Sequence, residues 1–268
     1  REGKVYKVGN TKTEIYIMTH KEFTAPDLHE YIPLRVGAAL SGDDFGYMRD
    51  DTGENISDKN PSYCELTGMY WVWKNTSDDF KGLAHYRRYF GRRAFSGDTR
   101  DILAFDQLKA MLDGCDIVLA KPAVYHVSVR EQLLMECCAP DTLDRLDAAM
   151  ASLRPDSLAA YCQVFAGNRV SQYNMLFCRG ELFDAYCEWL FPVLFELEGE
   201  IDLTGANDYQ QRLYGFLSER LLNVWVLQRG LRARHVPVVS TEYSMKDHLT
   251  YFRRDITNGL RFRLGQRR

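Results

Sequence analysis

Residues 49–90 read RDDTGENISDKNPSYCELTGMYWVWKNTSDDFKGLAHYRRYF and carry the pattern from which the architecture follows. Between Tyr63 and Lys74, apolar side chains recur at helical spacing, so this part predicts a helix. The run FKGLAHYRRYF, from Phe80, predicts a strand that continues into an arginine-bearing loop. The segment therefore joins a helix to a strand, which is the alternation typical of an α/β sheet.

The same alternation continues along the rest of the chain. Strands are predicted from short apolar runs at 14–20, 34–39, 116–122, 173–180 and 235–243. Helices are predicted at 105–115, 127–137, 181–200 and 207–230, and at 141–165 with a break at Pro155. We therefore expect an α/β sheet flanked by helices, with the C-terminal helices packed against it.

Composition sets the broad class of the protein. With 268 residues and 46% hydrophobic content, the chain can bury a sizeable core. No repeat or low-complexity linker divides it, so we expect one domain over residues 1–268. We expect a nucleotide-binding part up to about 125, an acceptor-binding and catalytic part at 126–250, and a basic tail at 251–268.

Charge and cysteine usage exclude several classes. The net charge of −3 gives no sign of a nucleic-acid surface. The seven cysteines show no C-x-x-C spacing, so we expect buried free thiols in a reducing compartment, without disulfides or a zinc site. The first residues lack the apolar stretch of a secretion signal, and the most apolar helical stretch carries Asp184, Glu188 and Pro192. We therefore expect a cytoplasmic protein.

Residues 49–90 also concentrate polar, aromatic and cationic side chains beyond what packing requires. Guanidinium groups can grip a phosphate through two hydrogen bonds, and hydroxyl and amide groups suit a sugar. The side chains concerned include Asn55, Ser57, Asn60, Tyr63, His85, Arg87 and Arg88.

Several longer blocks carry a family resemblance. They are ENISDKNPSYCELTGMYWVWKN (54–75), KGLAHYRRYF (81–90), IYIMTHKEF (15–23), YNMLFCRGELFDAYCEWLFPVLFELE (173–198) and YGFLSERLLNVWV (214–226). They resemble bacterial capsular and exopolysaccharide biosynthesis proteins long grouped as a domain of unknown function, some of which are glycosyltransferases. The resemblance implies a GT-A-like, Rossmann-type fold. It also implies transfer of a sugar, galactofuranose from UDP-galactofuranose, to a glycan or lipid-linked oligosaccharide.

Donor-binding residues are expected where strands end. Thr19, His20 and Lys21 follow the first predicted strand, and open α/β sheets bind ligands beyond the carboxyl ends of their strands. In a nucleotide-sugar enzyme this turn would contact the nucleoside. Asn55, Ser57, Asn60 and Tyr63 are candidates for the base, ribose or diphosphate. Asn55 and Ser57 can equally cap the helix that follows them.

Metal dependence is left open by the sequence. GT-A enzymes often hold a divalent metal through a D-x-D motif at a strand end, whereas this chain has His85-Tyr86-Arg87 at that place. One solution is that Arg87 and Arg88 offset the diphosphate charge directly, and we favour it. The other is that Mn²⁺ or Mg²⁺ is held by other groups, for which the candidates are Asp50, Asp51, Asp116 and His248.

An inverting transferase needs a carboxylate that deprotonates the acceptor hydroxyl. Asp208 ranks first because it stands where a loop becomes a helix, as in the acidic motif of inverting GT-A enzymes, with Asn207 in place of the glutamate. Glu219 ranks second, with a buried salt bridge as its ordinary role, and Glu198 is a distant third. Tyr173 and Asn174, at the mouth of a predicted strand, are candidates for sugar or acceptor binding.

The C-terminal tail suggests a membrane contact, and two alternative functions of the chain remain open. Arginines alternate with apolar residues in YFRRDITNGLRFRLGQRR (251–268), which suits contact with anionic lipid at the inner membrane face or a solvated end. The same fold could use a different nucleotide-sugar. Alternatively, the chain could be a non-catalytic glycan-binding or assembly module, which would not bind nucleotide.

Overall fold

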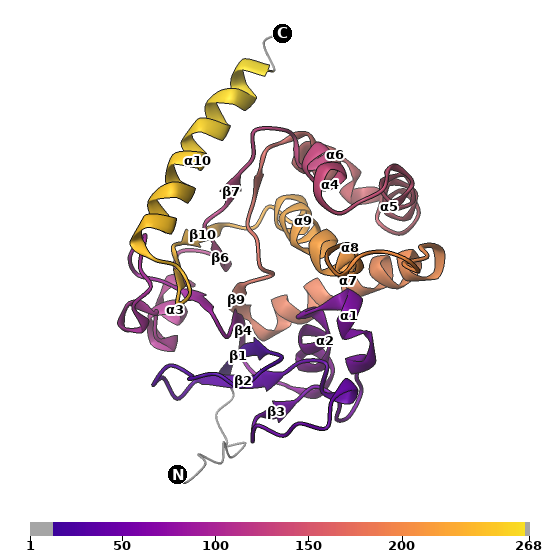
Figure 1. The fold of residues 1–268 in the computed structure, drawn as a ribbon. Coiled ribbons are helices and arrows are strands. Elements are labelled where there is room, and N and C mark those ends of the chain that lie inside the picture. Colours follow the sequence, from indigo (N-terminus) through magenta and orange to yellow (C-terminus); the bar gives the residue numbers. More distant parts are fainter. Residues whose placement is uncertain (1–12, 266–268) are drawn as a thin grey trace.

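The computed structural model describes residues 13–265 and builds them around one mixed sheet (Figure 1). Its strands run in the order β10-β6-β9-β4-β1-β2-β3, and β5 joins β4 to β11. The strands are β1 (Thr13–Thr19), β2 (Tyr31–Arg35), β3 (Met48–Arg49), β4 (Phe80–His85), β5 (Arg88–Phe90), β6 (Ile117–Ala120), β9 (Leu176–Arg179), β10 (Ala233–Val236) and β11 (Val238–Ser240). A separate pair joins β7 (Ala123–Val124) and β8 (Arg169–Val170).

Strand direction determines which residues meet at one edge of the sheet. β1 is parallel to β2 and to β4, with Met18 paired to His85, and β9 is antiparallel to β4. The carboxyl ends of β1 and β4 therefore lie beside the amino end of β9. Thr19, His85 and the turn before β9 are brought together in this way.

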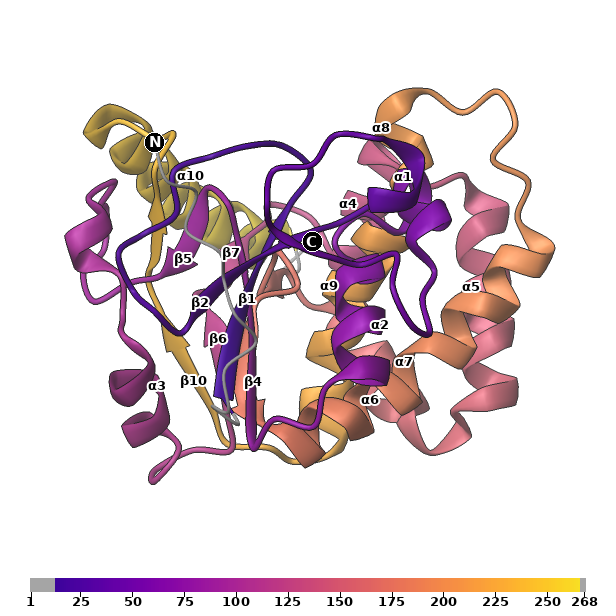
Figure 2. The ribbon, with the colours of Figure 1, turned by 90° about the horizontal axis from the view of Figure 1, so that it is seen from below.

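Helices cover both faces of the sheet, as Figure 2 shows. Those on one face are α1 (Asn60–Tyr63), α2 (Leu66–Asn75), α5 (Pro140–Leu153), α6 (Leu158–Ala166), α7 (Gly180–Glu200) and α9 (Leu213–Gln228). The other face packs on α3 (Phe105–Met111). α4 (Val129–Glu136) contributes Leu133 to the same core as the first group and packs on α6. The described part also contains α8 (Asp208–Gln211) and α10 (Met245–Gly265), which packs on β7.

Alternation along β1 explains the two cores. Tyr16 and Met18 belong to the larger cluster, with α2, α7 and α9, while Ile15 and Ile17 belong to the cluster with α3. Because both faces of the strand are buried, its sequence is apolar throughout rather than alternating with polar residues. This two-sided burial confirms the predicted α/β sheet with helices packed against it.

Some local predictions were wrong. The helix predicted over 63–74 is split at Cys64, where φ is 52°, and the strand predicted at 34–39 lies earlier, at Tyr31–Arg35. The tail from 251 is part of the long helix α10 up to Gly265, and residues 266–268 fall outside the described part. All seven cysteines are free, but Cys162 is exposed. No helix within 13–265 has the length and apolar character needed to cross a membrane.

Candidate active site

A cavity of about 470 Å³ opens where β1, β4 and the amino end of β9 meet. The ends of these strands, the start of α2, and α8 with the turn into α9 all contribute to its wall. Among the described residues, the wall consists of Met18, Thr19, His20, Val36, Asn60, Pro61, Cys64, Glu65, His85, Tyr86, Arg87, Arg88, Tyr173, Asp208, Gln211, Arg212 and Glu219.

Strained backbone gathers at this cavity. Within the described part, four non-glycine residues have positive φ, and Cys64, Tyr173 and Asn174 are three of them. Such conformations cost about 1–3 kcal/mol each and persist only where the surroundings enforce them. The Nδ2 of Asn174 donates to Glu65 Oε1 at 2.7 Å, and the Tyr173 backbone N–H donates to Glu219 Oε1 at 2.6 Å. Two glutamates thus hold the turn before β9 in place.

Both glutamates line the cavity, Glu219 buried and Glu65 half-buried. Burial raises the pKa of Glu65 and of Glu219, and the charge of Glu65 raises the pKa of Glu219 further. The other oxygen of Glu219 accepts from Arg220 Nη1 at 2.6 Å, and this arginine is 2% exposed. Glu219 is therefore committed on both oxygens, which fits a positioning role better than that of a free base.

His85 ends β4 beside the same turn. Burial lowers the pKa of its imidazole to about 4, so the ring is neutral at pH 7. Its Nε2 lies 2.5 Å from the carbonyl oxygen of Tyr173. A neutral histidine that donates to this carbonyl holds the peptide after Tyr173, the first residue of the strained turn, while Glu219 holds its N–H.

Guanidinium groups from two elements surround the cavity. Arg87 pairs with Glu242 at 2.9 Å, and Arg88 stacks over the Tyr173 ring at 4.4 Å with its buried Nε unpaired. Arg212 donates to Cys64 Sγ at 3.4 Å from the opposite wall. The pKa of His20 is lowered first by burial and then by Lys21, Arg87 and Arg212. The charged groups that act on His20 are thus positive, and cations at this place suit a diphosphate.

Asp208 is the first residue of α8 and is exposed. The capping of this helix is carried by Asn207, whose side chain accepts from the N–H groups of Tyr209 and Gln210. No side-chain hydrogen bond joins Asp208 to another residue in 13–265, although it lines the cavity. The carboxylate is therefore available for a ligand rather than committed to the helix end.

The structure brings many of the predicted residues together. Thr19, His20, Asn60, His85, Arg87, Arg88, Tyr173, Asp208 and Glu219 all line the cavity. Lys21, Asn55, Ser57, Tyr63 and Asn174 are not part of its wall.

The residues outside the wall have other partners. Ser57 donates to Asp50 at 2.5 Å, and the N–H of Ser57 bonds Asn55. The Tyr63 hydroxyl donates to Glu198 at 3.2 Å. These contacts secure the segment that leads into α1 and α2. Asn174 lies directly behind the wall, and Lys21 stacks on Tyr86 at 4.8 Å from its ring centre.

Glu65, Tyr86 and Arg212 are among the wall residues that sequence reasoning did not name as donor-binding, sugar-binding or catalytic candidates. Glu65 stands at the start of α2, Tyr86 in the turn after β4, and Arg212 between α8 and α9. Glu65 belongs to residues 49–90, and the high density of polar side chains in that segment was a signal that could have identified Glu65 as a site residue. Arg212 had none, because only the packing of α9 against α1 carries it to the cavity.

The candidate metal ligands do not converge. Asp50 accepts from the N–H groups of Gly37 and Ala38, Asp51 pairs with Arg49, and Asp116 pairs with Arg232. His248 lies on α10. Within the described residues, no three His, Cys, Asp or Glu side chains form a metal-binding group. The donors present do not fit a metal held by the protein alone, so we derive no step through one.

Comparison with known proteins agrees with this architecture. The chain is similar to a solved structure entitled WbbM bifunctional glycosyltransferase, with 29% identity and a TM-score of 0.79. The similarity covers 87% of this chain but 46% of that one, so this chain spans about half of its length. The sheet and its helices match a GT-A-like fold. Among curated proteins, none matches.

The family profile described as a domain of unknown function, DUF4422, matches residues 14–230. The match includes β1, β4, the turn before β9 and α8, and hence every element that forms the cavity wall. The chain belongs to the DUF4422 family.

Proposed function

We propose that the chain is a glycosyltransferase that binds a nucleotide diphosphate sugar in the 470 Å³ cavity. The observation that carries the proposal is the cavity itself. It lies beyond the carboxyl ends of two parallel strands, is surrounded by arginines, and has a free carboxylate on its wall. Similarity to a glycosyltransferase structure supports the same reading.

The finer assignments rest on the sequence blocks that resemble capsular and exopolysaccharide enzymes. They point to UDP-galactofuranose as donor and to a bacterial surface polysaccharide, or its lipid-linked precursor, as acceptor. We propose the cytoplasm, at the inner face of the membrane, as the location.

We propose the following roles for the residues of the cavity. Arg87 and Arg88, with Arg212 opposite, bind the diphosphate and stabilise the charge that develops on it as the sugar leaves. Asp208 takes the proton from the acceptor hydroxyl as this oxygen attacks the anomeric carbon, which gives inversion. Glu65 and Glu219 hold the turn at Tyr173 and Asn174, against which the sugar lies. Direct binding of the diphosphate by arginines needs no metal.

Single Arg87→Ala and Arg88→Ala variants should weaken UDP binding by about 1.5–3 kcal/mol, the scale of a hydrogen bond to a charged group. Isothermal titration calorimetry measures this loss. Arg93→Ala is the matched control, because Arg93 is 79% exposed and does not line the cavity. If UDP affinity is unchanged in both variants, Arg87 and Arg88 do not bind the donor.

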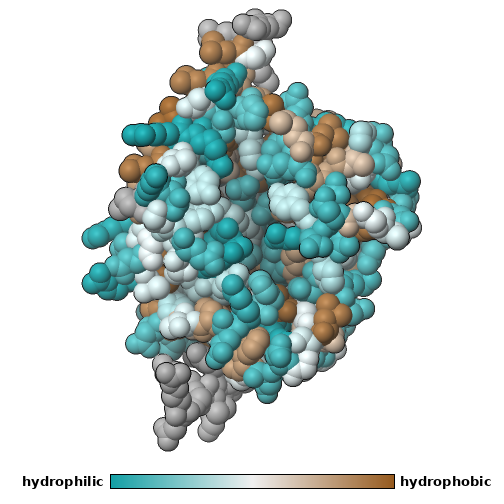
Figure 3. Space-filling model, in the orientation of Figure 1, coloured by the Kyte–Doolittle hydropathy of each residue, from teal (hydrophilic) through white to brown (hydrophobic). Residues whose placement is uncertain are grey.

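We also propose that α10 touches an anionic membrane surface. One side of this helix exposes Leu249, Phe252, Ile256, Leu260 and Leu264, at 40–63% exposure, and Figure 3 shows apolar atoms along its outer edge. Arg253 and Arg263 lie among these residues at helical spacing. Apolar residues interleaved with arginines suit the boundary between headgroups and acyl chains.

Vesicles that contain phosphatidylglycerol provide the test of this contact. Leu260→Glu with Leu264→Glu should reduce co-sedimentation at least about tenfold, because two leucines no longer enter the lipid. The control is Thr250→Glu with Thr257→Glu, which adds the same charge to α10 beside its exposed apolar residues. This double variant should reduce co-sedimentation less. Equal losses in both double variants would argue against an inserted apolar face.

A further inference from the structure

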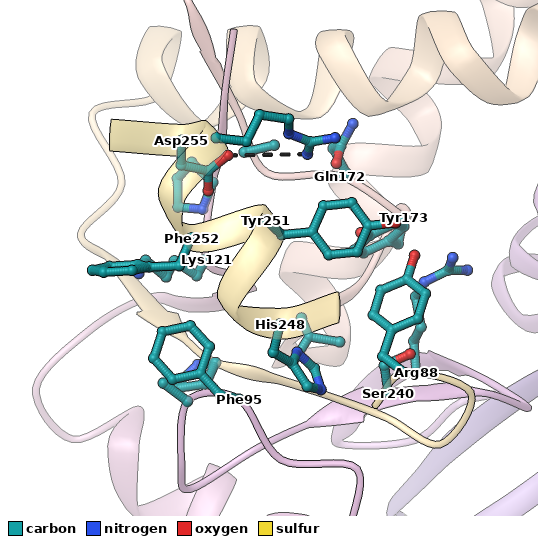
Figure 4. Close-up of a pocket in the computed structure, with 17 residues that line it drawn as sticks. Arg88, Phe95, Lys121, Gln172, Tyr173, Ser240, His248, Tyr251, Phe252 and Asp255 are labelled. Carbon is teal, nitrogen blue, oxygen red and sulfur yellow. Dashed lines mark ion pairs between the residues drawn. The ribbon is translucent and has the colours of Figure 1, made fainter. Parts of the chain in front are cut away.

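A second hollow, of about 160 Å³, lies beside the cavity just described. Arg88 and Tyr173 line both, so their stacked side chains form a shared wall. Helix α10 supplies one side through His248, Tyr251, Phe252 and Asp255, and the body of the domain supplies the other (Figure 4). Both α10 and β11 follow residue 230, where the family match ends.

Aromatic rings dominate this hollow. Phe95 meets Phe252 edge to face at 5.3 Å, and Tyr243 lies 5.0 Å from Tyr251. Phe95 is also the fourth non-glycine residue with positive φ in the described part, at 65°. Rigid aromatic surfaces that also carry hydroxyl groups offer a ring-shaped ligand both apolar contact and hydrogen bonds.

Buried polar atoms that make no hydrogen bond gather in the same place. Seven such side-chain atoms occur among the described residues, and four of them belong to the lining: Arg88 Nε, Ser240 Oγ, His248 Nε2 and Asp255 Oδ1. Of these, Asp255 Oδ1 has one long ion pair, to Arg254 Nη2 at 4.0 Å. Ser240 is 3% exposed and His248 is 8% exposed. A buried polar group without a hydrogen bond is destabilising, so a ligand that supplies the missing hydrogen bonds is favoured at this place.

The chemistry of these atoms specifies the ligand. A guanidinium N–H only donates, a carboxylate oxygen only accepts, and a serine hydroxyl does both. A phosphate would not satisfy Asp255, and an apolar ligand would satisfy none of the four atoms. A neutral ring with several hydroxyl groups can donate and accept around its edge while its faces contact the aromatic rings.

We propose that this hollow binds a sugar ring of the acceptor glycan, an inference that rests on the proposed transferase function. The shared wall of Arg88 and Tyr173 would place the acceptor sugar next to the donor. Acceptor choice would then be set by residues beyond the family match.

Saturation-transfer NMR with methyl galactofuranoside, galactopyranoside and glucopyranoside provides the test. Wild-type protein should show saturation of at least one glycoside, and Tyr251→Ala should reduce that signal at least fivefold. Asp255→Asn should also reduce it, without removing bulk from α10. UDP affinity should stay within twofold in both variants. Leu249→Ala, an exposed residue on the same helix outside the hollow, should change neither quantity.

Two results would overturn the acceptor site. One is the absence of saturation for all three glycosides in a protein that binds UDP. The other is a signal that persists undiminished in both variants while circular dichroism shows them folded. If UDP does not bind but Tyr251→Ala still removes a glycoside signal, the sugar site stands and the donor assignment fails.

Discussion

Asp208→Asn is expected to lower the turnover number by about 10²–10⁴-fold, the range that a general base contributes. Asparagine has the same shape but cannot take the acceptor proton. UDP affinity should be unchanged, since the arginines bind the diphosphate, and the fold should be unaffected because Asn207 caps α8. Release of UDP from UDP-galactofuranose in the presence of an acceptor glycan measures the turnover.

Asp202→Asn is the matched control for this variant. Asp202 is an exposed acid in the loop before α8, and it bonds the backbone N–H of Thr204 at 2.8 Å. Its replacement should leave turnover within about twofold, as is usual for a surface position. Retained turnover in Asp208→Asn would refute its role as base, and Glu65→Gln would then test the half-buried carboxyl group at the start of α2.

Arg220→Met is expected to cost about 3–5 kcal/mol of unfolding free energy, because it leaves Glu219 as a buried carboxyl group without its cation. The guanidinium of Arg220 also bonds Gln132 Oε1 at 2.6 Å and the carbonyl oxygen of Phe216 at 3.1 Å. Urea denaturation followed by circular dichroism measures the loss. Since Glu219 holds the Tyr173 backbone, the variant should also bind UDP more weakly.

The comparison variant is Arg232→Met, which breaks the pair with Asp116. That arginine is 65% exposed, and an exposed ion pair contributes at most about 1 kcal/mol. Glu219→Gln combined with Arg220→Met should recover part of the loss, because no uncompensated charge remains. If Arg220→Met and Arg232→Met lose the same unfolding free energy, the buried Glu219–Arg220 pair does not stabilise the cavity wall.

The sheet could be predicted because its strands are buried on both faces and therefore appear as continuous apolar runs. The break at Cys64 could not, since it depends on side-chain contacts that apolar spacing does not report: Asn60 Nδ2 bonds the Cys64 carbonyl oxygen at 2.7 Å and Thr67 Oγ1 at 3.2 Å, and the distant Arg212 donates to Cys64 Sγ at 3.4 Å. The helical character of the tail was hidden for a similar reason. Its face toward the body includes Asn258, whose Nδ2 bonds the Val124 carbonyl oxygen.

The residues of the candidate site also fall into those that the sequence could predict and those that it could not. Thr19, His85 and Arg87 could be placed from sequence because each stands at or just after the end of a strand, and the ends of parallel strands share an edge. Glu65 and Arg212 reach the cavity only through helix packing, which no local pattern reports. Residues such as Ser57 have the right chemistry but satisfy the backbone and side chains of their own loop.

Calorimetric titration of UDP into the wild-type protein, first in EDTA and then with Mn²⁺, is the decisive measurement. We predict binding in EDTA, because the arginines at the cavity bind the diphosphate without a metal. If UDP binds only with Mn²⁺, the cavity is still a nucleotide-sugar site, but a metal rather than the arginines binds the diphosphate. No binding in either condition would contradict the account and favour a non-catalytic module.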